Sequence, residues 1–239
     1  MKGRFPVGLT VAAAVALAVL LGLGLWQMRR LAWKTDLLAR IAAARHASPR
    51  PLADVLAEAA RGADVGFTRV ETACAPASGP APPVYRYALR QGRVGWRLMG
   101  ACRLAGGTTI ALDRGLVDRF AGAMAPAAAA FPPAASVVGV LRKPGSAGFL
   151  TPAPAKARDG SVSLLAIDPA ALKLIAGPAA APWYLAVEQE TPPPPGVTPA
   201  ALPQDIPNNH FVYALTWFGL AGVLIWMWAA FVVRRMRGR

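Results

Sequence analysis

The sequence predicts a membrane protein of the α+β class, in which two transmembrane helices, one near each terminus, flank a mainly antiparallel β domain. The chain of 239 residues is 55% hydrophobic and 16% charged, which is more apolar than an ordinary soluble domain. The apolar residues concentrate in two charge-free segments, residues 7–28 and 211–233. Between these segments, short alternating runs separated by glycine and proline indicate β-strands.

Each apolar segment is long enough to cross a bilayer. At about 1.5 Å rise per residue, segments of 22 and 23 residues form helices of about 33 Å and 34 Å, compared with a hydrocarbon core of about 30 Å. We therefore expect transmembrane helices at residues 7–28 and 210–233. The first segment also has features of a cleaved secretory signal, but its apolar run is longer than usual and lacks a small-x-small cleavage site. An uncleaved anchor is therefore favoured.

The charge distribution predicts the orientation of the chain. Two crossings place both termini on the same side, and the tail at residues 234–239 contains four arginines. Five basic residues also lie within residues 29–45, so the orientation depends on the rule that short, densely basic tails stay in the cytoplasm. Residues 1–6 and 234–239 are thus predicted to be cytoplasmic, and residues 29–209 periplasmic.

The net charge of +14 does not by itself indicate nucleic-acid binding, because the arginines between the two apolar segments are scattered. Anionic lipid headgroups or an acidic protein surface are the expected partners of this charge. The chain has only two histidines and shows no Ser/His/Asp spacing, metal-ligand cluster or glycine-rich phosphate loop, so enzymatic activity is not expected. Asp113 and Asp118 flank Arg114-Gly115, which we interpret as a turn with a salt bridge.

The domain between the apolar segments divides into three parts by composition. Good helix formers predict helical structure over residues 31–60, and near-alternation predicts mainly β structure over residues 65–190. The segment 191–207 contains four consecutive prolines and is predicted to be a stiff, extended linker. The individual elements expected are helices at 52–60 and 169–176 and strands at 67–73, 84–90, 94–104, 108–112, 136–142, 161–167 and 183–190.

Both cysteines, Cys74 and Cys102, lie in the predicted periplasmic domain, where a disulfide can form. Their spacing matches no metal-binding motif. Spacing alone does not establish whether the two Cβ atoms approach each other, so a disulfide and two free thiols are both compatible with the sequence.

The start of the second apolar segment contains the residues best suited to bind a ligand. The amide of Asn208 or Asn209 can cap a helix that begins there, which places His210 in the first turn. His210, Tyr213 and Trp217 follow an i, i+3, i+7 spacing and share one helical face. This pattern fits an interfacial aromatic belt. It also fits a site where the neutral imidazole of His210 ligates a haem iron beside the aromatic face.

Two motifs near the ends of the chain resemble those of the Surfeit locus protein 1 family of cytochrome c oxidase assembly factors. Residues 23–34 resemble the family's Gly-x-Trp-Gln-x-x-Arg-x-x-x-Lys pattern, and residues 208–218 resemble its Asn-His-x-x-Tyr-Ala-x-Thr-Trp-Phe pattern. The motif residues are Trp26, Gln27, Arg30, Lys34, Asn209, His210, Tyr213 and Trp217. Weaker similarity continues between the two motifs, at residues 95–96, 112–117, 139–142 and 148–150.

The resemblance implies a non-enzymatic assembly factor that holds haem a or delivers it to the catalytic subunit of cytochrome c oxidase. It implies that His210 binds the haem iron and that Tyr213 and Trp217 line the porphyrin, with the haem a synthesis machinery as a further partner. With no mitochondrial-type transit segment ahead of residue 7, a bacterial member in the plasma (inner) membrane is expected. The main alternative is a haem-independent structural chaperone that stabilises oxidase subunits through helix and domain contacts. The third interpretation is a general receptor with two membrane spans that binds a periplasmic ligand.

Overall fold

The computed structural model describes residues 5–75, 83–90, 93–117, 131–146, 148–149, 151–199 and 207–238. The chain forms two compact units. One contains Met1–Arg40 and Gln204–Arg239 and is called the helix pair; the other contains Ile41–Pro203 and is called the sheet domain. The mixed α+β class predicted from the sequence is confirmed.

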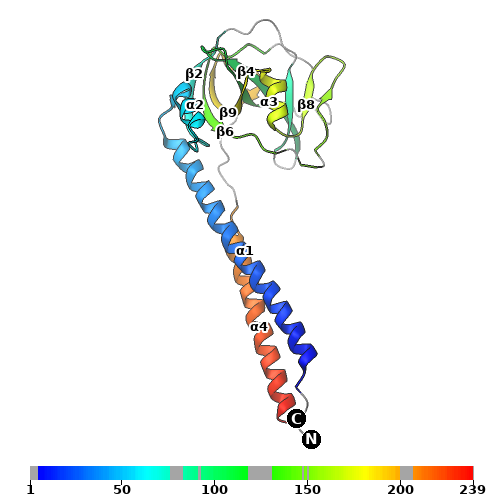
Figure 1. Ribbon diagram of the computed structural model, residues 1–239. Coiled ribbons are helices and arrows are strands. Elements are labelled where there is room, and N and C mark those ends of the chain that lie inside the picture. The colour runs from blue at the N-terminus through cyan, green and yellow to red at the C-terminus, as the bar shows by residue number, and fades with distance from the viewer. Residues whose placement is uncertain are drawn as a thin grey trace. The chain divides into compact units, whose positions relative to one another are not determined.

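The helix pair consists of α1 (Val7–His46) and α4 (His210–Met236), which lie side by side in Figure 1. α1 is one continuous helix of 40 residues, so the apolar segment 7–28 and the polar helix that follows form a single element. It ends shortly before Pro49, because the residue before a proline disfavours helical geometry. Both helices are long and apolar enough to cross a membrane.

The contact between the two helices follows a regular seam. The side chains of Ala214 and Ala221 on α4 are buried, and Gly24 on α1 lies directly against the Phe218 ring. Alternating three- and four-residue steps keep one helix face toward the other, as in a left-handed coiled coil. The buried or half-buried seam residues include Thr10, Ala13, Leu17, Leu20, Gly24, Gln27, Leu31 and Lys34 on α1 and His210, Ala214, Trp217, Ala221, Leu224 and Trp228 on α4.

In its described residues, the sheet domain contains ten strands in the order β1-β2-β6-β9-β5-β4-β3-β8-β7, with β10 paired to β5. Six of the nine strand pairings are antiparallel. The strands are β1 (Arg50–Pro51), β2 (Arg69–Ala73), β3 (Val84–Arg90), β4 (Arg93–Arg103), β5 (Thr109–Val117), β6 (Ser136–Arg142), β7 (Ala155–Lys156), β8 (Val162–Leu164), β9 (Ala180–Thr191) and β10 (Val197–Thr198). The helices are α2 (Leu52–Ala60) and α3 (Pro169–Ala176).

The linker predicted over residues 191–207 differs from the structure at its start. β9 continues to Thr191, and β10 pairs with the end of β5. Gly115 makes this pairing possible: its φ of +133° suits glycine, and a Cβ there would collide with the backbone of Thr198. The sheet therefore includes part of the expected linker, while residues 200–206 lie outside the described residues.

The largest core of the sheet domain lies between α2 and the central strands. Leu52 and Val55 of α2 pack with Leu141 and Leu185, all of them at most 1% exposed. A disulfide between Cys74 and Cys102 joins the end of β2 to β4, which are not neighbours in the strand order. The sequence left open whether these cysteines are bonded, because only the fold brings two such distant strands together.

β5 carries two charged residues at adjacent positions, Asp113 at 2% and Arg114 at 6% exposure. Asp113 accepts hydrogen bonds from Arg97 at 2.8 Å and Arg86 at 3.3 Å, whereas Arg114 donates to Glu190 at 2.9 Å. The interpretation of residues 113–115 as a turn is therefore wrong. Adjacent strand residues point to opposite faces of a sheet, and each face here supplies a partner of opposite charge. Asp118 lies outside the described residues.

Candidate functional site

The two motifs found near opposite ends of the sequence meet in the helix pair. Gln27 lies on α1, and His210 is the first residue of α4, 183 positions further along the chain. Nδ1 of His210 lies 2.7 Å from Oε1 of Gln27. Both side chains are half-buried, so each motif contributes one half of a polar contact on the seam.

A second group of contacts holds the chain just before α4. Nζ of Lys34 donates to the backbone oxygen of Pro207, and Nδ2 of Asn208 donates to Oγ1 of Thr35 at 3.5 Å. Gln27 and Lys34 are seven residues apart, which is two helical turns, so both face the same side of α1. The first motif therefore contacts the second at two positions, which are two turns apart on α1.

The start of α4 differs from the expected capping geometry. Asn209 is the N-cap residue, but no side chain caps this helix with a hydrogen bond. The predicted amide cap is wrong, because the side-chain oxygen of Asn208, which would accept a capping hydrogen bond, has no partner. Its amide nitrogen donates to Thr35. The start of α4 is thus held by contacts with α1.

The remaining motif residues lie on exposed or flanking surfaces of the helix pair. Tyr213 is 55% exposed and Trp26 is 56% exposed, whereas Trp217 is half-buried. The guanidinium of Arg30 lies 3.9 Å from the ring centroid of Trp33. The structure thus brings His210 together with Gln27 and not with Trp26 or Arg30.

Thr35, Trp33 and the carbonyl of Pro207 take part in these contacts and were missed by sequence reasoning. One feature of the sequence indicated the contact between the helices: Gln27 and Lys34 follow the same seven-residue spacing as the apolar seam. That spacing places two polar side chains on a face otherwise made of small and aliphatic residues. It therefore marks them as contacts between the helices.

The contact with Gln27 indicates which nitrogen of His210 faces a ligand. An amide oxygen only accepts hydrogen bonds, so with this amide orientation Nδ1 is the donor, and Nε2 is the ring nitrogen that faces away from Gln27. Histidines that bind metals commonly donate their other ring N–H to such an acceptor, which fixes the ring and strengthens the ligand. The contact therefore orients the His210 ring through Nδ1 and leaves Nε2 as the nitrogen placed to bind a metal.

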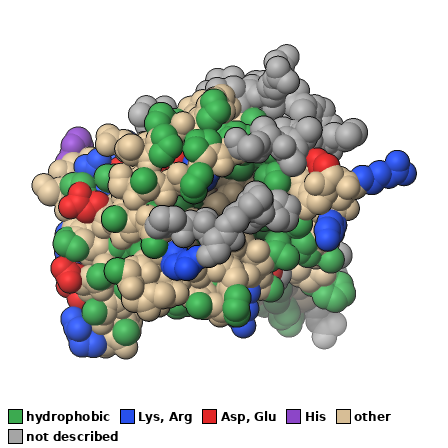
Figure 2. Space-filling model, turned by 90° about the horizontal axis from the view of Figure 1, so that it is seen from above, with side chains coloured by type: hydrophobic (Ala, Val, Ile, Leu, Met, Phe, Trp, Pro, Cys, Tyr) green, Lys and Arg blue, Asp and Glu red, His purple; other side chains and the backbone are tan. Residues whose placement is uncertain are grey.

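The sheet domain offers a different kind of surface. A groove of about 560 Å³ runs between α2 and the ends of β2 and β9, with Leu56, Leu104 and Trp183 in its wall and no titratable side chain in its lining. On the face shown in Figure 2, the basic side chains are separated from one another by hydrophobic and acidic ones. These features provide an apolar contact surface and no arrangement of reactive groups among the described residues.

In chain order, the sheet domain lies between two helices that are long and apolar enough to cross a membrane, and one of them begins with a histidine held at the helix contact; this is the architecture of a two-helix protein compatible with a membrane. The chain belongs to the SURF1 family, whose family model matches residues 14–222 and so covers both motifs. This family is known for the assembly of cytochrome c oxidase, and it is a family of assembly factors and not of catalysts. A search of curated proteins found no match. The family resemblance stated from the sequence is thus confirmed.

Proposed function

We propose that this chain is a membrane-anchored assembly factor that holds haem a at His210 and presents it to the catalytic subunit of cytochrome c oxidase. The observation that carries the proposal is the 2.7 Å contact between Nδ1 of His210 and Oε1 of Gln27. It engages Nδ1 and leaves Nε2 as the nitrogen that would bind the haem iron.

The residues present suit a haem better than a bare metal ion. Among the described residues, no group of three or more His, Cys, Asp or Glu side chains lies close enough to hold an ion. A haem would bring its iron already bound by its own ring, so the imidazole of His210 would be enough to hold it. Trp217 lies on the same helix face as His210 and offers an aromatic surface beside it.

Both helices are proposed to cross the bacterial inner membrane, with the termini in the cytoplasm and the sheet domain in the periplasm. His210 and Arg234 are 24 residues apart on α4, or about 36 Å, which exceeds a hydrocarbon core of about 30 Å. The arginine-rich end then lies on the cytoplasmic side. The opposite end places His210 at the outer surface, within reach of a membrane-embedded oxidase subunit.

The test is the visible spectrum of the full-length protein purified from cells that make haem a. We expect haem bands in the wild type, their loss in His210→Ala, and no change in His46→Ala. Gln27→Leu should weaken haem binding about 10–100-fold, because it removes the acceptor that orients the imidazole. A wild-type protein without haem bands, or a His210→Ala spectrum like that of the wild type, would disprove haem binding at this residue.

The alternative is a haem-independent structural chaperone. The contacts from Lys34 to Pro207 and from Asn208 to Thr35 support it, because they tie the helices together without any ligand. A cell that produces only His210→Ala separates the two functions. Normal oxidase levels in that cell would favour the structural chaperone, and loss of haem a from the oxidase would favour haem delivery.

A further inference from the structure

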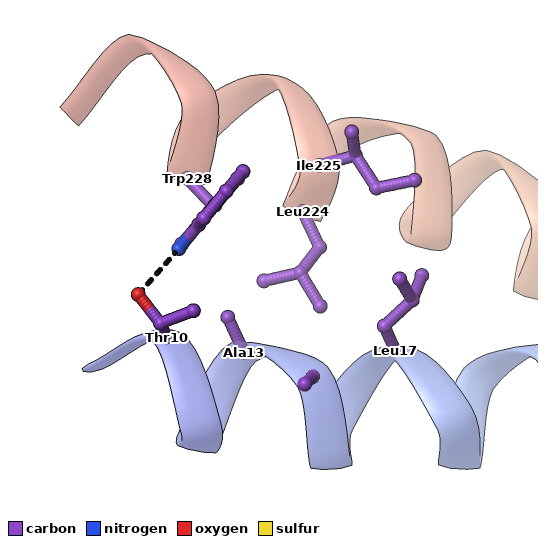
Figure 3. A pocket seen from close by; sticks show the side chains of 7 residues that line it. Thr10, Ala13, Leu17, Leu224, Ile225 and Trp228 are labelled. Carbon is purple, nitrogen blue, oxygen red and sulfur yellow. Dashed lines mark hydrogen bonds between the residues drawn. The ribbon is translucent and has the colours of Figure 1, made fainter. Parts of the chain in front are cut away.

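The helix pair contains an apolar groove at residues 224–228 of α4, in the second half of that helix. Its volume is about 180 Å³, and Figure 3 shows it between the two helices. We call it the inner groove. Its lining residues are Thr10, Ala13, Ala14, Leu17, Leu224, Ile225 and Trp228.

The small side chains of α1 and the large ones of α4 together create this space. Ala13 lies opposite Leu224 in Figure 3, and Ala14 and Ile225 line the same groove. The methyl side chains of the two alanines leave space between the helices that the larger side chains of α4 do not fill. A void of this kind loses dispersion contacts on the side of its missing atoms. A ligand of matching shape would restore those contacts.

One end of the inner groove is closed by a hydrogen bond between the helices. Nε1 of Trp228 donates to Oγ1 of Thr10 at 3.2 Å, and the same hydroxyl donates to the backbone oxygen of Pro6 at 3.0 Å. The polar atoms of Thr10 and Trp228 are therefore already paired. The rest of the groove offers a ligand only hydrocarbon and aromatic surface. Such a surface suits a hydrocarbon chain.

The volume limits the size of that ligand. An apolar cavity of about 150 Å³ in another protein holds one benzene molecule, so the inner groove has room for a few carbon atoms. A porphyrin ring or a helix of about 10 Å diameter is too large. The occupant is therefore a narrow chain, entering from the side of the groove that Trp228 does not close.

The position of the inner groove relates it to His210. Leu224 lies 14 residues after His210 on the same helix, which corresponds to about 21 Å along the axis. If His210 lies at the outer surface, the groove lies within the hydrocarbon core. A molecule with its ring at His210 and a long tail directed into the membrane would reach it.

We propose that the inner groove binds the far end of the isoprenoid tail of haem a, and this inference rests on the function proposed above. Haem b has the same iron and ring plane but no such tail. A ring held at His210 raises the local concentration of its own tail at the groove, relative to free lipid chains. The groove thus distinguishes haem a from haem b, which axial ligation alone does not.

The first experiment tests the groove without haem. A farnesyl photoprobe is added to the full-length protein in lipid nanodiscs and compared with a straight-chain fatty-acid photoprobe. We expect the farnesyl probe to label the peptides that contain Leu17 and Leu224 in the wild type. Ala14→Phe fills the groove and should abolish this labelling. Ala12→Phe makes the same change about 160° around α1 and should not.

The second experiment measures the affinity of the same proteins for haem a and haem b. Ala14→Phe should weaken haem a binding about tenfold, which corresponds to ~1.4 kcal/mol, and leave haem b binding unchanged. The tail assignment would be overturned if Ala14→Phe affected both haems equally. It would also be overturned if the two photoprobes labelled the protein equally, or if the farnesyl probe labelled other peptides. His210→Ala should abolish binding of both haems and keep farnesyl labelling, so failure at His210 is distinguishable from failure at the groove.

Discussion

The helix pair and the sheet domain differ in how much of their apolar surface is buried. In the helix pair, only 6% of the most apolar 18-residue window of each helix is buried, so most of that surface faces outward. In the sheet domain, leucine and valine side chains such as Leu141, Leu185 and Val55 are fully buried. The sheet domain therefore covers its apolar side chains with a core of its own, whereas the apolar surface of the helix pair suits the membrane crossing proposed above.

The two regions also differ in how they use polar groups. In the sheet domain, Asp113 and Arg114 are buried and matched by charges of opposite sign, so they are committed to the fold. In the helix pair, His210 makes one hydrogen bond through Nδ1 and its second nitrogen remains able to bind a ligand. The comparison indicates that the charges of the sheet domain stabilise its fold, whereas the haem binding proposed above is assigned to the helix pair.

The largest expected effect tests the buried charges of the sheet domain. Arg114→Leu leaves the carboxylate of Glu190, whose side chain is 4% exposed, without its partner. We expect the free energy of unfolding to fall by about 3–5 kcal/mol, measured by urea unfolding of the full chain in detergent. Arg50→Leu is the matched control, because Arg50 pairs with Glu58 on the exposed surface and should contribute little. A similar loss in both variants would contradict the assignment.

A smaller effect is expected from the seam of the helix pair. A Cβ on Gly24 would collide with the Phe218 ring, whereas a Cβ on Gly22 meets nothing within 4 Å. Gly24→Leu should weaken helix association by about 1–3 kcal/mol through overpacking, and Gly22→Leu should not. The measurement is the yield of a disulfide between Gln27→Cys and His210→Cys in each background. Equal yields would mean that this seam is not the contact in the membrane.

The smallest effect is the pH dependence of the buried pair. Burial raises the pKa of Glu190, and Arg114 opposes that rise. The contribution of Glu190 to stability is therefore complete below its unfolded-state pKa of about 4.3 and decreases as pH rises through the higher folded-state pKa. Glu190→Gln should remove this decrease in urea unfolding between about pH 4 and pH 7.

Glu58 provides the opposite sign as a control. The hydrogen bond from Arg50 lowers the pKa of Glu58, so its contribution is lost as pH falls. Glu58→Gln should therefore leave the decrease attributed to Glu190 in place. If Glu58→Gln removes it and Glu190→Gln does not, the buried pair is not its source.

Local patterns predicted individual elements closely where apolar spacing and breakers agreed. The expected helices 52–60 and 169–176 match α2 and α3, and the strands 84–90 and 136–142 match β3 and β6. The prediction failed at residues 113–115, where two charges and a glycine are typical of a turn. The partners of these charges, Arg97 and Glu190, lie on other strands. A local sequence pattern does not predict an ion pair between different strands of a sheet.

The sequence by itself determined that the chain has two bilayer-length apolar segments, which residues form its two motifs, and which family it resembles. These properties depend on spacing and composition, which are local. Only the tertiary structure decided that Gln27 meets His210 and that Lys34 holds Pro207 before α4 begins. The reason is physical: a hydrogen bond reaches about 3 Å, so residues 183 positions apart acquire a shared chemistry only when packing brings their helices together.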